Sequence, residues 1–316
     1  MKVLHIIRSM DPVRGGMAAG IRQITPALFE LGVYTSVLSL DKPNSPWFNS
    51  NCYGSLGLGP VAGEYGYRQG LPRRIFSLAS EHDVVIIHGI WHYHSFATWR
   101  ALHRSSIPYY VYPHGMLDPW FKHKFPMKHL KKMIYWPLTD YRVLRDAKAV
   151  LYTSERECAL ARESFSLYSG NDVVVGFGAS SPPSSNSSKS DSFLHRFPHL
   201  RGKRQVLFVG RIDKKKGIDL LIDAFSNLVN IIPNIHLVIA GPDVGGLQST
   251  LESQVSRLNI SNHVTWTGML DNEQKWGAYR SAELFCLPSH QENFGVAVAE
   301  ALACALPVAL SNSVNI

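Results

Sequence analysis

Two acidic residues, Glu292 and Glu300, follow a strand predicted over residues 284–287. Glu292 lies in the loop after this strand, and Glu300 lies more than one turn into the predicted helix that comes next. Gly295 and the small apolar residues after it open that helix. The free N–H groups of a helix N-terminus bind anions, and a carboxylate accepts two hydrogen bonds from the paired hydroxyls of a sugar. The pattern therefore predicts a site for a ligand with anionic groups and hydroxyls. The alternative is an acid that complements the helix dipole, followed by an exposed glutamate.

A run of basic residues, 211–216, follows a second predicted strand and lies between two glycines. Arginine offers a fork of donors to phosphate, and lysine offers a point charge. Arg211 and Lys216 are the preferred phosphate ligands because they sit beside the glycines. Lys214 and Lys215 are explained equally well as solvated loop residues.

Two further candidates lie in the first half of the chain. Gly15 and Gly16 separate the strand predicted over residues 3–7 from a helix, and His114 follows the strand predicted over residues 109–112. The glycine pair is not part of a GxGxxG sequence, so a dinucleotide-dependent dehydrogenase is unsupported. His114 is the best candidate for an active-site histidine, with a structural histidine of the loop as the alternative.

Three histidines, His88, His92 and His94, have the spacing His-x3-His-x-His at and after a predicted strand. Imidazole is a common ligand of transition metals. No nearby cysteine or carboxylate completes a ligand set, so no metal is expected there. The four cysteines of the chain are scattered without CxxC spacing, which favours a reduced compartment with neither disulfides nor a zinc site.

Short apolar runs alternate with helix-like stretches along the whole chain, which is typical of an α/β fold with parallel sheets buried on both faces. Helices are predicted between the runs, including an amphipathic helix over residues 218–229. The predicted strands span residues 3–7, 34–40, 84–88, 109–112, 149–152, 173–175, 205–209, 235–240, 264–267, 284–287 and 307–310.

The composition predicts two Rossmann-like doubly wound domains, residues 1–178 and 196–316, joined by a linker over residues 179–195. The linker is inferred from a Ser- and Pro-rich run that cannot pack a core; a long surface loop within one domain is the alternative. Only residues 311–316 follow the last predicted strand, too few for another crossover helix. We therefore expect the second domain to be incomplete.

Positive charge is concentrated in the first half of the chain. Residues 1–150 contain 18 Lys and Arg against 9 Asp and Glu, whereas residues 151–316 contain 14 against 15. The stretch 120–148 mixes lysine and arginine with aromatic residues and methionine, which suits an anionic membrane surface. A solvated helix face with the aromatics in the core is the alternative. Nucleic acid is not expected as a partner, because no recognised binding module is present.

The location is expected to be cytoplasmic, either free or docked on the inner face of the cell membrane. The sequence contains no run of eighteen apolar residues, which is about the length needed to span a bilayer. The apolar stretch at the N-terminus is interrupted by Arg8 and Asp11, so it is a poor signal peptide and a good first strand.

The loops of the second half, taken together, resemble the donor half of the GT4 family of retaining glycosyltransferases. The matching features are the Gly-Arg…Lys-Gly loop at 210–217, the strand end Ala-Gly-Pro at 240–242, and Pro-Ser…Glu-x-Phe-Gly…Glu-Ala at 288–301. The likeness extends over residues 205–307. It implies a GT-B fold and a hexosyltransferase that moves a sugar from a nucleotide sugar to a glycan or lipid-linked acceptor in polysaccharide biosynthesis.

The resemblance also implies roles for single residues. Arg211 and Lys216 would hold the donor diphosphate, and Glu300 would hold the ribose. Glu292 would contact the transferred sugar, which His114 would face, so these two are the candidate catalytic residues. The remaining donor-binding residues would be Gly15, Gly16, Asn293, Phe294 and Gly295. Neither metal nor cofactor is implied, since cationic side chains and helix ends replace the metal ion.

A function of a different class is also compatible with the sequence. A truncated, catalytically silent protein could bind a nucleotide or a glycan without turning it over. The abrupt carboxyl end motivates this alternative, because a missing helix would leave apolar surface exposed.

Overall fold

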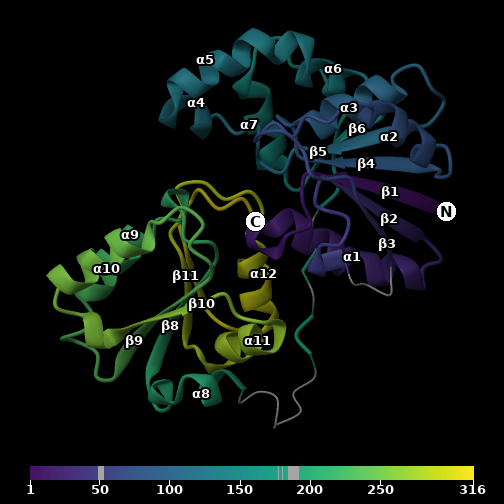
Figure 1. Ribbon diagram of the computed structural model, residues 1–316. Coiled ribbons are helices and arrows are strands. Elements are labelled where there is room, and N and C mark those ends of the chain that lie inside the picture. The colour runs from purple at the N-terminus through teal and green to yellow at the C-terminus, as the bar shows by residue number, and fades with distance from the viewer. Residues whose placement is uncertain (49–52, 177, 180, 184–191) are drawn as a thin grey trace. The chain divides into compact units, whose positions relative to one another are not determined.

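The computed structural model describes residues 1–48, 53–176, 178–179, 181–183 and 192–316 (Figure 1). The chain forms two compact units, Met1–Gly178 and Ala179–Ile316. Most of the predicted linker, including residues 184–191, lies outside the described residues.

The described part of the first unit contains a seven-stranded sheet in which the strands run parallel in the order β3-β2-β1-β4-β5-β6-β7. The order runs outward in both directions from β1, so the chain reverses direction between β1 and β4, where ligands bind in doubly wound sheets. The strands are β1 (Lys2–Ile7), β2 (Tyr34–Ser39), β3 (Tyr53–Gly57), β4 (Val84–His88), β5 (Tyr109–Tyr112), β6 (Ala149–Tyr152) and β7 (Asp172–Val174).

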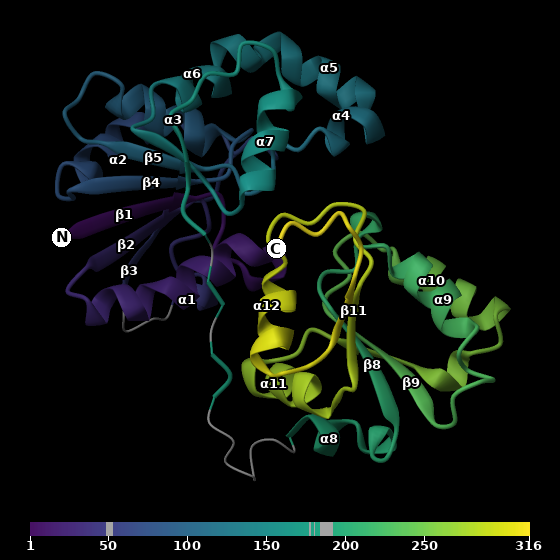
Figure 2. The same ribbon diagram turned by 180° about the vertical axis from the view of Figure 1, so that it is seen from behind.

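Helices flank this sheet, with α1 on one side and α2 and α3 on the other (Figures 1 and 2). Right-handed crossovers that leave β1 and β4 in opposite directions produce this arrangement. Central positions such as Val85, Ile87 and Val111 are fully buried as a result. The helices are α1 (Gly16–Glu30), α2 (Leu71–Ala79), α3 (Tyr93–Leu102), α4 (Trp120–Lys124), α5 (Pro126–Tyr135), α6 (Asp140–Arg145) and α7 (Glu155–Ser164).

The second unit contains a five-stranded parallel sheet among its described residues, in the order β10-β9-β8-β11-β12. Helices α9 and α10 cover one face, and α11 and α12 cover the other (Figures 1 and 2). The strands are β8 (Arg204–Val209), β9 (Ile235–Ala240), β10 (Val264–Gly268), β11 (Leu284–Leu287) and β12 (Val308–Leu310). The helices are α8 (Ser192–Arg196), α9 (Ile218–Ser226), α10 (Gln248–Arg257), α11 (Asn272–Ser281) and α12 (Val296–Ala303).

The α/β class with parallel sheets is confirmed, with the bounds of the predicted strands correct to within one residue and three larger local differences. Strand β3 was not predicted, because its two glycines, Gly54 and Gly57, are poor strand formers. The predicted linker is too long at its end, since Ser192 already begins α8 and Phe193 is fully buried. The amphipathic helix ends at Ser226, three residues before its predicted end. No helix within the described ranges is long and apolar enough to cross a membrane.

Candidate active site

Two loops meet at the carboxyl edge of the second sheet, where β8 and β11 are neighbours. One loop, residues 210–217, carries the basic run, and the other, residues 288–295, carries Glu292. The N–H of His290 donates to the carbonyl of Lys215 at 2.7 Å. Gly217 lies so close to the second loop that a Cβ there would be 2.1 Å from the carbonyl oxygen of Pro288. The backbone therefore brings the predicted cations and the predicted acid together.

Lys216 and Glu292 form an ion pair between these loops through Nζ and Oε2. Only 12% and 14% of their side-chain areas are exposed. Burial works to raise the pKa of Glu292, but Lys216 and Lys215 outweigh it and hold the pKa below its ordinary value. Glu292 is therefore a carboxylate at neutral pH. Arg211 forms no ion pair with any residue in the described part of the chain.

Lys215 is a cation of this site that the sequence did not single out. Its Nζ lies 3.5 Å from Oε1 of Gln291, a neutral partner. Burial lowers the pKa of Lys215 to about 8, and Lys216 adds to the effect. The three lysines form a single 3-10 turn in which Lys214 is exposed while the other two face the second loop. Three identical residues carry no periodicity that would reveal which of them is buried.

Glu300 lies on α12 and has partners from α11. Its Oε1 is 2.6 Å from Nζ of Lys275, and its Oε2 accepts a hydrogen bond from Tyr279 Oη at 3.0 Å. The glutamate side chain is 4% exposed. Burial, and then the carboxylate, raise the pKa of Tyr279 well above its ordinary value, so the phenol keeps its proton and donates. Nothing in the sequence marked Lys275 or Tyr279, because their role depends on how α11 packs beside α12.

The segment after β12 holds the backbone of Glu292 from its other side. The N–H of Glu292 donates to Ser313 O at 3.1 Å, and the N–H of Asn315 donates to Glu292 O at 3.2 Å. These bonds add one parallel bridge, Glu292 to Val314, beyond the pairing of β11 with β12. The last residues of the chain therefore position a candidate catalytic residue. Asn293, Phe294 and Gly295 complete the turn into α12, with Gly295 at a φ of 70°.

The glycine pair of the first unit lies where β1 leads into α1. Gly15 has a φ of 95°, a conformation that favours glycine. Gly16 is the first residue of α1, and no described heavy atom lies within 4 Å of the position that its Cβ would take. Asp41 holds the preceding loop by accepting from Ser9 Oγ at 2.6 Å and from Met10 N–H at 2.7 Å.

His114 lies just beyond β5 with a φ of 52°. The next residue is tied to α7, because the N–H of Gly115 donates to Oε1 of the buried Glu157 at 2.7 Å. Gly89, after β4, packs between Met116 and Met17, so the loops after β1, β4 and β5 come together. Burial lowers the pKa of His114 to about 4, so the ring is neutral at pH 7.

The three spaced histidines do not converge on a common point. His92 Nδ1 lies 3.1 Å from Ile90 O, and His94 Nε2 lies 3.0 Å from His88 O. The ring of His88 contacts two other imidazoles instead, His5 and His114. Among the residues that the structure describes, no group of three or more His, Cys, Asp or Glu is arranged to hold a metal ion.

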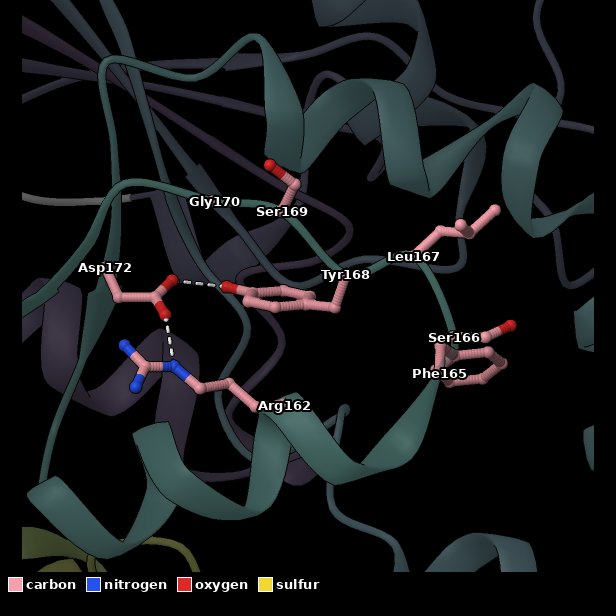
Figure 3. Close-up of a pocket in the computed structure, with 8 residues that line it drawn as sticks. All are labelled: Arg162, Phe165, Ser166, Leu167, Tyr168, Ser169, Gly170 and Asp172. Atoms are coloured by element: carbon pink, nitrogen blue, oxygen red, sulfur yellow. Dashed lines mark hydrogen bonds and ion pairs between the residues drawn. The ribbon is translucent and has the colours of Figure 1, made fainter.

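A surface pocket of about 490 Å³ lies elsewhere, on the turn from α7 into β7 (Figure 3). Its polar side chains bind one another: Asp172 accepts from Tyr168 Oη at 2.5 Å and from Arg162 Nε at 2.8 Å (Figure 3). The pocket is at the edge where β7 begins, opposite the carboxyl ends of the strands. These bonds explain the residues as a brace for the turn, and the pocket is not part of the candidate site.

Both units of the chain match models of known protein families. Residues 191–316 match the family described as "Glycosyl transferases group 1", and residues 15–178, more than half of the chain, match "Glycosyl transferase 4-like domain". The chain belongs to the GT4-type glycosyltransferases. The first of the two matches contains Arg211, Lys216 and Glu292, and the second contains His114.

Curated relatives of this GT4-type chain match it over part of their length. The D-inositol 3-phosphate glycosyltransferase of Segniliparus rotundus is 36% identical over 109 residues, 33% of this chain and 23% of that protein. The phosphatidyl-myo-inositol mannosyltransferase of Mycobacterium leprae is 35% identical over 121 residues, 38% of this chain and 30% of that protein. The matched region thus spans less than a third of each relative.

Solved structures resemble the GT4-type chain over nearly its whole length. Anabaena HepE in complex with UDP-glucose has a TM-score of 0.76 and 17% identity, covering 100% of this chain and 81% of that one. Sucrose-phosphate synthase of Thermosynechococcus elongatus has a TM-score of 0.74 and 21% identity, covering 99% and 82%. The predicted GT-B fold is confirmed.

Proposed function

We propose that the chain transfers a hexosyl unit from a nucleoside-diphosphate sugar to a glycan or lipid-linked acceptor, with retention at the anomeric carbon, in polysaccharide biosynthesis. The observation that carries this proposal is the cluster of Arg211, Lys215 and Lys216 at the carboxyl edge of the second sheet. These cations outnumber the nearby carboxylates, Glu292 and Asp213. The negative charge of a diphosphate would more than offset this excess. The structural relative HepE, solved in complex with UDP-glucose, supports the same donor class.

The chemistry of the proposed reaction follows from the pairing of the acids. Glu292 is already paired with Lys216, and Glu300 with Lys275, so we assign neither as a covalent nucleophile. Arg211, the lysines and the N-terminus of α12 would stabilise the departing diphosphate. Glu292 would accept hydrogen bonds from the sugar, and the acceptor would attack the same face. The cations take the part of a metal ion in this scheme.

The test of this function is release of nucleotide from radiolabelled UDP- and GDP-sugars by the purified chain, alongside calorimetry of nucleotide binding. Arg211→Ala and Lys216→Ala should each weaken nucleotide affinity by about 10- to 150-fold, because charge-assisted phosphate bonds contribute roughly 1.5–3 kcal/mol. Unchanged affinity in both variants would remove these residues from the site.

Glu292→Gln is the matched control, because it removes the charge and keeps the shape of the side chain. It should bind nucleotide at least as well as the original chain, since Lys216 is released from its partner, and it should transfer sugar poorly. Nucleotide binding without turnover by the unaltered chain would favour the alternative of a silent binding protein.

We also propose that α5 docks on an anionic membrane surface from which a lipid-linked acceptor is drawn. Helix α5 has no buried residue. Met127, Leu130 and Ile134 recur at the spacing of one helix face and are 70%, 54% and 72% exposed. Lysines of the same helix could meet lipid phosphates. Trp136 is in the core, as the alternative of a solvated face with buried aromatics expects, but that alternative does not explain the exposed Met127, Leu130 and Ile134.

The docking proposal is tested by co-sedimentation with phosphatidylglycerol vesicles. The chain should pellet with these vesicles and be released by salt, because screening weakens attraction to lipid phosphates. Replacing both Met127 and Ile134 by serine should abolish binding. Leu31→Ser is the control, since Leu31 is 78% exposed at the end of α1. Equal partitioning onto neutral vesicles, or no binding to either, would contradict the proposal.

A further inference from the structure

Three imidazole rings form a hydrogen-bonded line inside the first unit. His5 Nδ1 lies 2.9 Å from His88 Nε2, and His88 Nδ1 lies 3.0 Å from His114 Nε2. His5 and His88 are buried, on the paired strands β1 and β4. Tyr112 stacks against both His88 and His114, with ring centroids 5.6 and 5.3 Å apart. The line therefore runs from the core of the sheet to the candidate catalytic histidine.

The protons of the three rings must all point one way along this line. Burial and the neighbouring imidazoles lower the pKa of His88 well below its ordinary value, and burial lowers those of His5 and His114 to about 4. All three rings are thus neutral at pH 7, and a neutral imidazole has one N–H donor and one acceptor nitrogen. Because His88 bonds through both nitrogens, it accepts from one neighbour and donates to the other.

The surroundings of His5, at the end of the line away from His114, decide which way the N–H groups point. His5 Nε2 is buried and has no hydrogen-bond partner among the described residues. Protons that pointed toward His5 would place an N–H there without an acceptor, a state that folded proteins rarely contain. Protons that point toward His114 leave only a bare lone pair. His94 behaves in this way: its Nε2 must donate to His88 O, and its unpartnered nitrogen, Nδ1, is the bare one.

We propose that His5 and His88 are positioning residues that hold His114 in the tautomer with its proton on Nδ1. Nε2 of His114 accepts the hydrogen bond of His88, so the ring has no lone pair left for a general base. In this tautomer the ring of His114 is a neutral hydrogen-bond donor at Nδ1 and not a base. The effect on transfer rests on the proposed function, whereas the tautomer itself does not.

Nitrogen-15 NMR of the full chain, labelled at histidine, tests the tautomer directly, because the chemical shift separates protonated from unprotonated ring nitrogens. The His114 signals are identified by their loss in His114→Gln. We expect a protonated Nδ1 and an unprotonated Nε2 for His114 at pH 7. A proton on Nε2 of His114 overturns the proposal. Because the measurement uses the unaltered chain, its result does not depend on whether a His88 variant folds.

A pair of nearly isosteric variants tests the positioning role. His88→Asn keeps an amide donor near the position of Nδ1 and should preserve the tautomer of His114. His88→Asp presents an acceptor and should move the proton to Nε2. Transfer should then be about tenfold slower in His88→Asp than in His88→Asn, as for loss of one hydrogen bond. Equal tautomers in the two variants overturn the proposal.

His103→Asn is the control, because its ring contacts Trp99 O on α3 and takes no part in the line. It should leave both the His114 signals and the transfer rate unchanged, and a His114 shift of the same size as in His88→Asp would count against a specific line. If neither the unaltered chain nor any of these variants transfers sugar, but the His114 tautomer responds as expected, the proposed function fails and the positioning inference stands.

Discussion

Replacement of Gly217 by alanine is expected to separate the two loops of the candidate active site and to lower nucleotide affinity at least as much as loss of Lys216. Gly217 has a φ of 65°, and a Cβ at this position would lie 2.1 Å from the backbone oxygen of Pro288. Neither atom belongs to a flexible side chain, so β8 and β11 must shift at the edge that carries Lys216 and Glu292. Strain and the lost contacts together should cost about 2–4 kcal/mol.

Calorimetry with UDP and GDP and urea unfolding of the full chain measure these two effects. Gly202→Ala separates the backbone strain from the clash, because Gly202 has a φ of 72° but no described heavy atom within 4 Å of its Cβ position. Gly245→Ala is the neutral control, with open space and no positive φ. If the Gly217→Ala variant binds nucleotide as tightly as Gly245→Ala does, the close approach of the two loops is not needed for nucleotide binding.

The first unit is expected to lose most of its stability between pH 7 and pH 5. From 6.5, burial lowers the pKa of His5 and His114 to about 4 and that of His94 to about 3, and the pKa of His88 lies well below its ordinary value. Unfolded rings take up protons near pH 6.5, whereas the folded rings stay neutral until about pH 4. Their contribution is therefore present above pH 6.5 and is lost as the pH falls from there.

One carboxyl group opposes this trend. Burial raises the pKa of Asp140 from 3.8 to about 6, so the folded state takes up a proton before the unfolded state does, and stability is gained as the pH falls through 6. The four rings less one carboxyl group give a net uptake of about three protons on unfolding, and His92 and His129, whose pKa values burial also lowers, add to it. Each proton changes the free energy of unfolding by about 1.4 kcal/mol per pH unit, giving roughly 4 kcal/mol per unit against a usual total of about 5–15 kcal/mol.

Urea unfolding of the full chain at pH 7 and pH 5, followed peptide by peptide with pulsed hydrogen exchange, measures this loss. The second unit is an internal reference, in which burial lowers the pKa of His236 to about 4. His94→Gln keeps a donor for the carbonyl of His88 and should reduce the acid sensitivity by about 1.4 kcal/mol per pH unit. A urea midpoint of the first unit that does not change between the two pH values would contradict the prediction.

Local sequence was sufficient to predict every strand of the described residues except β3. Continuous apolar runs such as 84–88 and 235–240 are strands with the predicted bounds, because a strand buried on both faces has to be apolar at every position. The basic run between glycines and the Glu-x-Phe-Gly turn predict a ligand with phosphate and sugar groups, and this ligand stays a prediction. These signals are local, since they depend on residues a few positions apart.

The tertiary structure alone decided which side chains support that chemistry. Lys275 and Tyr279 reach Glu300, Ser313 and Asn315 hold Glu292, and His5 bonds His88 across 83 positions of sequence. Each of these contacts depends on which strands or helices become neighbours and on their register. Strand order in a doubly wound sheet does not follow sequence order, so no local pattern could place His5 of β1 beside His88 of β4, or residue 313 beside residue 292.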